Sequence, residues 1–172
     1  MLARDVAIQR LGPENATLTV HTRRGGAAAK AGHDLELLVT AWRAVLDDTS
    51  AELTADGGSL RVQRGTGGMQ ALGEDDKANI HKTIDDDVLR RQDIVFRSTR
   101  VDGDRIEGEL TLAGRTQPIA FDLERREDGS LRARAVVTQT RWGLKPFSAL
   151  FGTLKVLDDV EVVLDARPAQ SP

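Results

Sequence analysis

The stretch Arg105–Leu123, RIEGELTLAGRTQPIAFDL, decides the fold of this chain. Every second residue from Ile106 to Leu112 is apolar or glycine, and the residues between them are polar. This alternation is typical of a β-strand with one buried face. The pattern resumes from Ile119 to Leu123, after a turn in which Gly114 supplies the backbone freedom that tight turns need. We therefore predict an antiparallel hairpin.

The same alternation runs through most of the chain and predicts an all-β fold. A third strand is expected over 131–137, directly after the turn signal Asp128-Gly129. Because unpaired edge strands invite aggregation, we expect the sheet to close into an antiparallel up-and-down barrel of about eight strands. The remaining strands are expected at 16–22, 35–46, 51–55, 59–64, 94–101 and 156–164.

One segment has helical rather than strand periodicity. Ile80, Ile84 and Val88 recur every fourth residue, which predicts one α-helix from about Asp75 to Arg91, packed on the barrel. We expect a single barrel domain over 1–165. Residues 166–172 contain two prolines and no periodicity, so they are predicted to be a flexible tail.

Composition excludes several classes of protein. A length of 172 residues fits one domain, and 24 basic against 27 acidic residues give no positive excess for binding nucleic acid. The absence of cysteine excludes disulfides, thiolate metal sites and thiol catalysis. No apolar run is long enough to span a membrane, and the start of the chain has no signal-peptide pattern, so we expect a cytoplasmic protein.

No group of residues has the spacing of a catalytic or metal site. His21, His33 and His81 are scattered, and His81 is expected to form a salt bridge on the helix surface. His33 has two readings, a general base or ligand at the barrel mouth and a turn histidine bonded to backbone. The acidic runs at 74–76 and 85–87 suit helix capping and a solvated face. We predict no catalytic residue, metal or cofactor, and therefore no enzyme.

The segment 140–152 combines aromatic residues and leucines with a proline and two glycines, so it is predicted to be a structured apolar loop. It either plugs one end of the barrel or forms the wall of a cavity. Lys145 would then offer its ammonium group to a polar head group at the mouth. The candidate ligand-binding residues in this loop are Trp142, Lys145, Phe147, Leu150 and Phe151.

The inward face of the barrel is predicted to enclose a cavity. Gly108, Ala133 and Ala135 share the phase of the large apolar residues on their strands, and such small residues leave unfilled volume. A barrel of eight strands is wide enough to hold one slender ligand. The candidate ligand-binding residues on this face are Leu18, Val20, Phe96, Leu110, Leu112, Phe121, Ala133, Ala135, Val137, Val160 and Val162.

Five stretches of the chain resemble the YceI family of lipocalin-like, polyisoprenoid-binding barrels. The most specific is the hairpin, in which the form G-x-L-T-x-x-G leads into T-x-P-I. The resemblance implies a lipocalin-like barrel with one helix, an amphiphilic isoprenoid in its channel and no catalytic residues. The matching stretches are AGHDL (31–35), IVFRST (94–99), GELTLAGRTQPI (108–119), WGLKPF (142–147) and LKVLDDV (154–160).

Two functions follow from these observations. The first is the binding or sequestration of an apolar or amphiphilic small molecule, isoprenoid or lipid-like, in the barrel interior. The alternative is a dimerising structural or stress-related barrel with a filled core and no ligand. We also predict a homodimer, from the resemblance and because Trp42 or Trp142 would form part of an exposed apolar patch.

Overall fold

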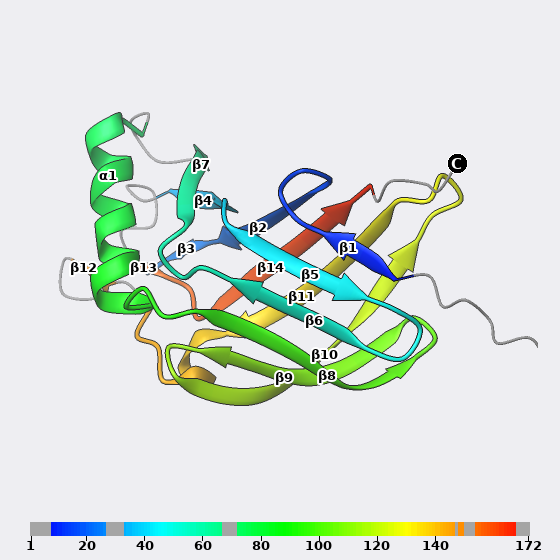
Figure 1. Cartoon of the computed structure of the whole chain (residues 1–172). Helices are drawn as coiled ribbons and strands as arrows, with labels where there is room; N and C mark the ends of the chain where they lie inside the picture. The colour runs from blue at the N-terminus through cyan, green and yellow to red at the C-terminus, as the bar shows by residue number, and fades with distance from the viewer. Residues whose placement is uncertain (1–7, 27–32, 67–71, 147, 150–153, 168–172) are drawn as a thin grey trace, which may run out of the picture.

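A computed structural model describes residues 8–26, 33–66, 72–146, 148–149 and 154–167 of the chain. The described part of the chain is all-β apart from one short helix and two helical turns. Its main element is a curled antiparallel sheet of eleven strands in the shape of a half-barrel (Figure 1). A second, small sheet contains β12 (Ser148–Ala149), β13 (Leu154–Val156) and β3 (Arg24–Gly25).

Neighbouring strands in the main sheet are antiparallel throughout. Most of its strands correspond to segments that alternation predicts. The exception is β1, which, like the three strands of the small sheet, is too short to show a period. In sheet order the eleven strands are β1 (Gln9–Leu11), β5 (Trp42–Leu46), β6 (Ala51–Ala55), β8 (Ile94–Asp102), β9 (Arg105–Leu112), β10 (Arg115–Arg125), β11 (Leu131–Thr138), β14 (Asp159–Ala166), β2 (Ala16–Thr22), β4 (Asp34–Val39) and β7 (Leu60–Thr66).

The hairpin predicted from Arg105 to Leu123 is confirmed as β9 and β10. Leu112 pairs with Arg115 next to the turn, and Ile106 pairs with Phe121 at the far end. Gly114 has φ +81°, which glycine adopts at little cost.

A bent hairpin links the two ends of the sheet. The predicted strand 35–46 is divided into β4, which pairs with β2, and β5, which pairs with β6. The returning chain bends between β6 and β7, and the Thr40 amide donates to the Ser59 carbonyl at 2.9 Å across the bend. The closed eight-stranded barrel is not confirmed, because the order of the described strands ends at β1 and β7, which do not pair.

The predicted helix is present, but its end differs from the prediction. It consists of α1 (Glu74–Thr83) followed by one π-helical turn, η2 (Ile84–Val88), and it stands at one end of the curled sheet (Figure 1). The Asp76 carboxylate caps the start of α1 by accepting a hydrogen bond from the Gly73 amide at 3.1 Å. Arg90 and Arg91 have positive φ, so they lie outside the helix rather than at its negative end.

The C-terminal strand β14 extends to Ala166, which is buried and pairs with Leu131. The predicted boundary of the domain at residue 165 therefore falls one residue inside a strand. Residues 168–172 of the predicted tail lie outside the described residues.

The interior of the sheet has two parts. Towards the end opposite α1 it is a filled core, and towards α1 it contains a cavity whose wall includes helix residues. The members of the hydrophobic core cluster that do not line the cavity are Leu11, Trp42, Ala44, Leu46, Ala51, Ile106, Leu123, Leu131, Trp142 and Ala166.

Candidate functional site

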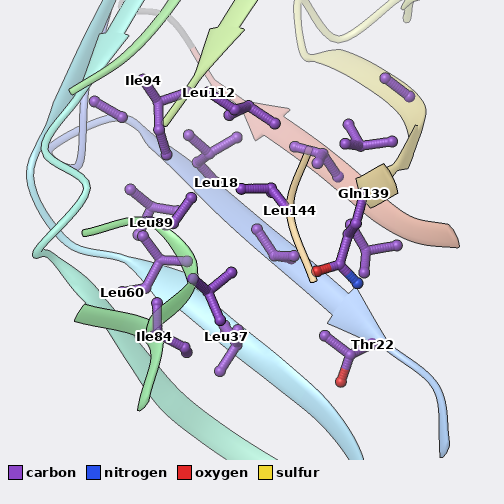
Figure 2. Close-up of a pocket in the computed structure, with 18 of the residues that line it drawn as sticks. Leu18, Thr22, Leu37, Leu60, Ile84, Leu89, Ile94, Leu112, Gln139 and Leu144 are labelled. Atoms are coloured by element: carbon purple, nitrogen blue, oxygen red, sulfur yellow. The ribbon is translucent and has the colours of Figure 1, made fainter. Parts of the chain in front are cut away.

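The candidate site is a cavity of about 390 Å³ in the concave side of the sheet, partly open to solvent (Figure 2). Strands from both halves of the sheet form most of its wall, and α1 and η2 close part of one side. Leu18 and Leu37 border this space from the paired strands β2 and β4, and Leu112 borders it from β9 (Figure 2). Such a wall favours an apolar occupant because it offers few hydrogen-bonding partners.

The structure places all of the predicted inward-facing residues in the wall of this cavity. They come from strands that adjoin in the sheet, and alternation brings their side chains to the same face. These residues are Leu18, Val20, Phe96, Leu110, Leu112, Phe121, Ala133, Ala135, Val137, Val160 and Val162.

Sequence reasoning missed wall residues from the helix and from several strands, which include Leu53, Ala55, Leu60, Ile94, Ile119 and Leu164. The alternation along β4 could have identified its inward-facing residues, which are Leu35, Leu37 and Val39. Ile84 and Leu89 enter the wall from η2 and the turn after it, and strand periodicity carries no information about where a helix docks.

Among the described residues of the apolar loop, one reaches the cavity. Leu144 lies in the wall, whereas Trp142 is buried beside it and its indole N–H donates to the Leu110 carbonyl at 2.7 Å. Lys145 is exposed and is not among the residues that line the cavity, and its contact with a head group at the mouth stays a prediction. The other candidates in this loop, Phe147, Leu150 and Phe151, lie outside the described residues.

Two of the three small inward residues border the free volume. Ala133 and Ala135 line the cavity, as expected. Gly108 does not, because the ring of Phe96 covers it: a Cβ atom at Gly108 would lie 2.6 Å from Phe96 Cζ. The missing side chain at Gly108 therefore makes room for an aromatic ring rather than for a ligand.

The wall carries few polar side chains. Thr22 is 9% exposed, and its Oγ1 atom has no hydrogen-bond partner in the described part of the chain. Gln139 is also buried, and its amide Nε2 donates to the Leu157 carbonyl at 3.2 Å. Asn79 and Thr83 add polar groups from α1. A ligand in this cavity can therefore find hydrogen-bonding groups at a few defined positions only.

The described wall residues offer no free charge to the cavity. Arg134 borders the cavity, but its guanidinium group is exposed and forms an ion pair with Glu161. Lysine, aspartate and glutamate are absent from the described wall. An ionised ligand group placed deep inside this cavity, away from its open side, would therefore be buried without an opposite charge, which is strongly unfavourable.

Among the described residues, no group of histidine, aspartate and glutamate side chains has the geometry of a metal site. His81 forms the expected salt bridge, with its Nε2 atom 3.2 Å from Asp85 Oδ2. The prediction of a solvated acidic face is wrong for Asp85, because η2 turns this side chain inward and buries it near Arg91. His21 bonds to the hydroxyl of Thr19 at 3.1 Å.

Both tryptophans are buried, at 7% exposure for Trp42 and 1% for Trp142. The exposed tryptophan patch that supported a homodimer is therefore contradicted by the structure. The largest exposed apolar side chains among the described residues are Ile8, Val136 and Leu157.

The fold and the cavity define a class of protein, a lipocalin-like curled sheet that surrounds an apolar pocket. The family model described as YceI-like domain matches residues 29–167, so this chain belongs to the YceI-like family. Within the described residues, no helix is long and apolar enough to cross a membrane.

One solved structure supports the fold assignment. The crystal structure of BcnA from Burkholderia cenocepacia has a TM-score of 0.56 to this chain and covers 90% of it and 96% of BcnA. The two sequences are 13% identical, so the likeness concerns the fold. The comparison with curated proteins finds no match.

Proposed function

We propose that this protein binds or sequesters an apolar or amphiphilic small molecule, isoprenoid or lipid-like, inside the curled sheet and does not transform it. The observation that carries the proposal is the apolar cavity of about 390 Å³, which lies within the usual size range of small-molecule sites. Membership of the YceI-like family supports the same class of ligand.

The expected affinity is sufficient for a carrier. Burial of about ten methylene groups contributes on the order of 8 kcal/mol at about 0.8 kcal/mol each. Ordering the ligand opposes this gain, and what remains is compatible with micromolar binding.

The proposal of a non-catalytic role rests on the chemistry of the wall. General acid–base catalysis needs a titratable side chain within hydrogen-bond reach of the reacting group. The titratable side chain in the described wall is Arg134, and its guanidinium group is paired outside the cavity.

The experiment is a fluorescence titration with N-phenyl-1-naphthylamine, an uncharged apolar dye. Ala135 lines the cavity, so Ala135→Phe should fill it and abolish dye binding with little loss of stability. Val136, the next residue of β11, is 60% exposed, so Val136→Phe should leave binding unchanged and serves as the matched control.

The alternative, a filled structural barrel without a ligand, makes the opposite prediction. The parent protein would then take up no apolar dye, and Ala135→Phe would overpack the interior at a cost of about 1 to 3 kcal/mol. That pair of results would reject the carrier function.

Two further expectations remain predictions. A homodimer would show as a concentration-dependent mass in analytical ultracentrifugation, and only monomer at tens of micromolar would reject it. A cytoplasmic location would be tested by cell fractionation.

A further inference from the structure

Residues 74–91, which form α1, η2 and the turn after them, are both a wall of the cavity and a neighbour of β7. Ile84 and Leu89 border the cavity from this helical segment, and Leu60 borders it from β7 (Figure 2). The helix α1 packs against β7 at one end of the sheet (Figure 1). Contacts between the helical segment and β7 therefore keep this side of the cavity covered.

His81 of α1 makes a direct contact with β7. Its Nε2 atom lies within hydrogen-bond reach of the Arg61 guanidinium group, and it is 3.2 Å from Asp85 Oδ2 and 3.4 Å from the Gly58 carbonyl oxygen. Arg61 is held in place, because it also donates to the carbonyls of Gly58 and Leu60 at 2.9 and 3.0 Å. The guanidinium group therefore cannot turn away from His81 without losing these two hydrogen bonds.

The neighbours of this ring nitrogen make opposite demands on it. The Arg61 guanidinium group only donates hydrogen bonds, so it needs Nε2 as an acceptor, which requires a neutral imidazole ring. A protonated ring carries hydrogen on both nitrogens and can only donate, and Asp85 then becomes its partner. Protonation of His81 therefore removes a hydrogen bond between α1 and β7, strengthens one inside the helical segment, and sets two positive charges against each other.

The charged groups around His81 favour release from β7 when the ring is protonated. Asp85 is buried, but it belongs to the same helical segment as His81, and its ion pairs are with His81 and Arg91. The Asp56 carboxylate accepts from the Gly58 amide at 2.8 Å, which engages it within the bend between β6 and β7. The charged groups on the elements next to His81 are Lys77 and Lys82 on α1, Asp85 on η2, Arg91 in the turn after it, Arg61 on β7 and Asp56 in the bend.

Strained features gather at the C-terminal end of the helical segment. η2 is a π-helical turn, and Arg90 and Arg91 follow it with φ of +54° and +57°, a region that residues with a Cβ atom rarely occupy. The Oδ1 atom of Asp85 is buried and has no hydrogen-bond partner in the described part of the chain. Such features lower the stability of a segment and are typical of parts that move. The join between this segment and β8 is therefore suited to act as a hinge.

We propose that residues 74–91 form a proton-controlled gate over the cavity. The gate is held on β7 when His81 is neutral and is released when His81 is protonated, so a bound molecule leaves the cavity faster in acid. Histidine ordinarily changes its charge between about pH 5 and about pH 8, and the gate responds in that range. This inference rests on the proposed carrier function.

The test measures how fast N-phenyl-1-naphthylamine leaves the full-length protein, by stopped-flow fluorescence at about pH 8 and about pH 5. The dye is uncharged, so a change in its release reports on the protein. The dissociation rate should be about fivefold higher at the lower pH, the usual effect of losing one neutral hydrogen bond.

Two substitutions should fix the gate in opposite states. His81→Gln keeps an oxygen that can accept from Arg61 but does not become charged, so release should be slow at both pH values. Arg61→Met keeps the length of the side chain but removes the donor, so release should be fast at both. The matched control is His21→Gln: His21 lies on β2 and bonds to the Thr19 hydroxyl at 3.1 Å, so this variant should keep the pH dependence of the parent.

Hydrogen exchange, followed by mass spectrometry, tests the movement of the gate without a ligand. The exchange rates are corrected for the intrinsic rate at each pH and compared with those of the hairpin of β9 and β10. The amides of α1 should then exchange about fivefold faster at about pH 5 than at about pH 8. In His81→Gln the two corrected rates should agree.

The results separate the gate from the carrier function. If the dye binds but neither its release nor the exchange of α1 responds to pH, or if His81→Gln responds as the parent does, the gate is overturned and the carrier function stands. If the dye binds at neither pH value, the carrier function fails, and the gate fails with it whatever the exchange rates are.

Discussion

The indole N–H of Trp142 donates to the Leu110 carbonyl, whereas the indole N–H of Trp42 has no acceptor among the described residues. Both side chains are buried, and this hydrogen bond is one difference between them; the Arg141 guanidinium over the Trp142 ring, at 5.1 Å from its centroid, is another. Replacing a buried donor leaves its acceptor unsatisfied, which costs more than the loss of contact area alone.

We therefore expect Trp142→Phe to destabilise the protein more than Trp42→Phe, by about 1 kcal/mol or more. Urea unfolding of the two variants measures the difference. Equal losses would show that the bond to Leu110 contributes nothing to stability.

The hydrogen bonds of the Asp47 carboxylate predict how the stability of the protein changes with pH. Its carboxylate accepts hydrogen bonds from the amides of Thr49 and Ser50, both at 2.8 Å, and these bonds lower the pKa of Asp47. A carboxyl group whose pKa is lower in the folded state than in the unfolded state stabilises the fold at pH values above its unfolded-state pKa. This stabilisation is lost as the pH falls through its folded-state pKa.

Asp47→Ala should therefore lose thermal stability at neutral pH and show a shallower decline than the parent below about pH 4. Thermal midpoints between pH 7 and pH 2 give both quantities. Asp48→Ala, at the exposed neighbouring residue, is the control and should follow the parent curve.

The alternation of apolar and polar residues predicts a strand well when one face of that strand is buried along its whole length. Phase along β9 and β11 assigns Leu110, Leu112 and Ala135 to the inward face, and the structure agrees. Phase cannot show that a neighbouring ring fills the space at Gly108, because that depends on the register between β8 and β9. It also cannot show that η2 is a π-helical turn, since apolar residues every fourth position fit an ordinary helix as well.

Gly108 gives a prediction at the scale of a strand pair. A Cβ atom there would lie 2.4 Å from the Arg97 carbonyl oxygen and would meet the Phe96 ring. We expect Gly108→Ala to cost about 3 kcal/mol, the upper end for an overpacked core, and to weaken dye binding because Phe96 is pushed into the cavity.

The control is Gly103→Ala in the turn between β8 and β9. Gly103 has φ +60° with nothing within 4 Å of the added atom, so only the cost of a left-handed residue, about 1 kcal/mol, is expected. Dye binding should be unaffected in this control. A Gly108→Ala protein with parental stability would show that the contact with Phe96 relaxes freely.

At the scale of the whole molecule, sequence patterns are least informative. The sequence of each segment of the bent hairpin is that of an ordinary strand. Alternation therefore could not show that β5 and β6 pair near one end of the sheet while β4 and β7 pair at the opposite end. It also could not show that the interior is filled at one end and hollow at the other, because volume is set by strands that are distant in sequence.

This division of the interior predicts an asymmetry between two similar leucines. Leu131 lies in the filled end and Leu112 lies in the cavity wall, and both are buried. A leucine in a filled core loses contacts on all sides when it is shortened and leaves a new void. A leucine beside an existing cavity has fewer contacts to lose.

We therefore expect Leu131→Ala to cost about 3 to 5 kcal/mol and Leu112→Ala about 2 kcal/mol in the absence of ligand, measured by urea unfolding. Saturation with N-phenyl-1-naphthylamine should stabilise the parent and Leu131→Ala by similar amounts, because the dye contacts the cavity wall and not the filled end. In Leu112→Ala the stabilisation should differ from that in the parent, since the wall itself is altered. Equal losses in the two variants, together with equal effects of the dye, would mean that the interior is packed uniformly, and the carrier function would then lose its structural basis.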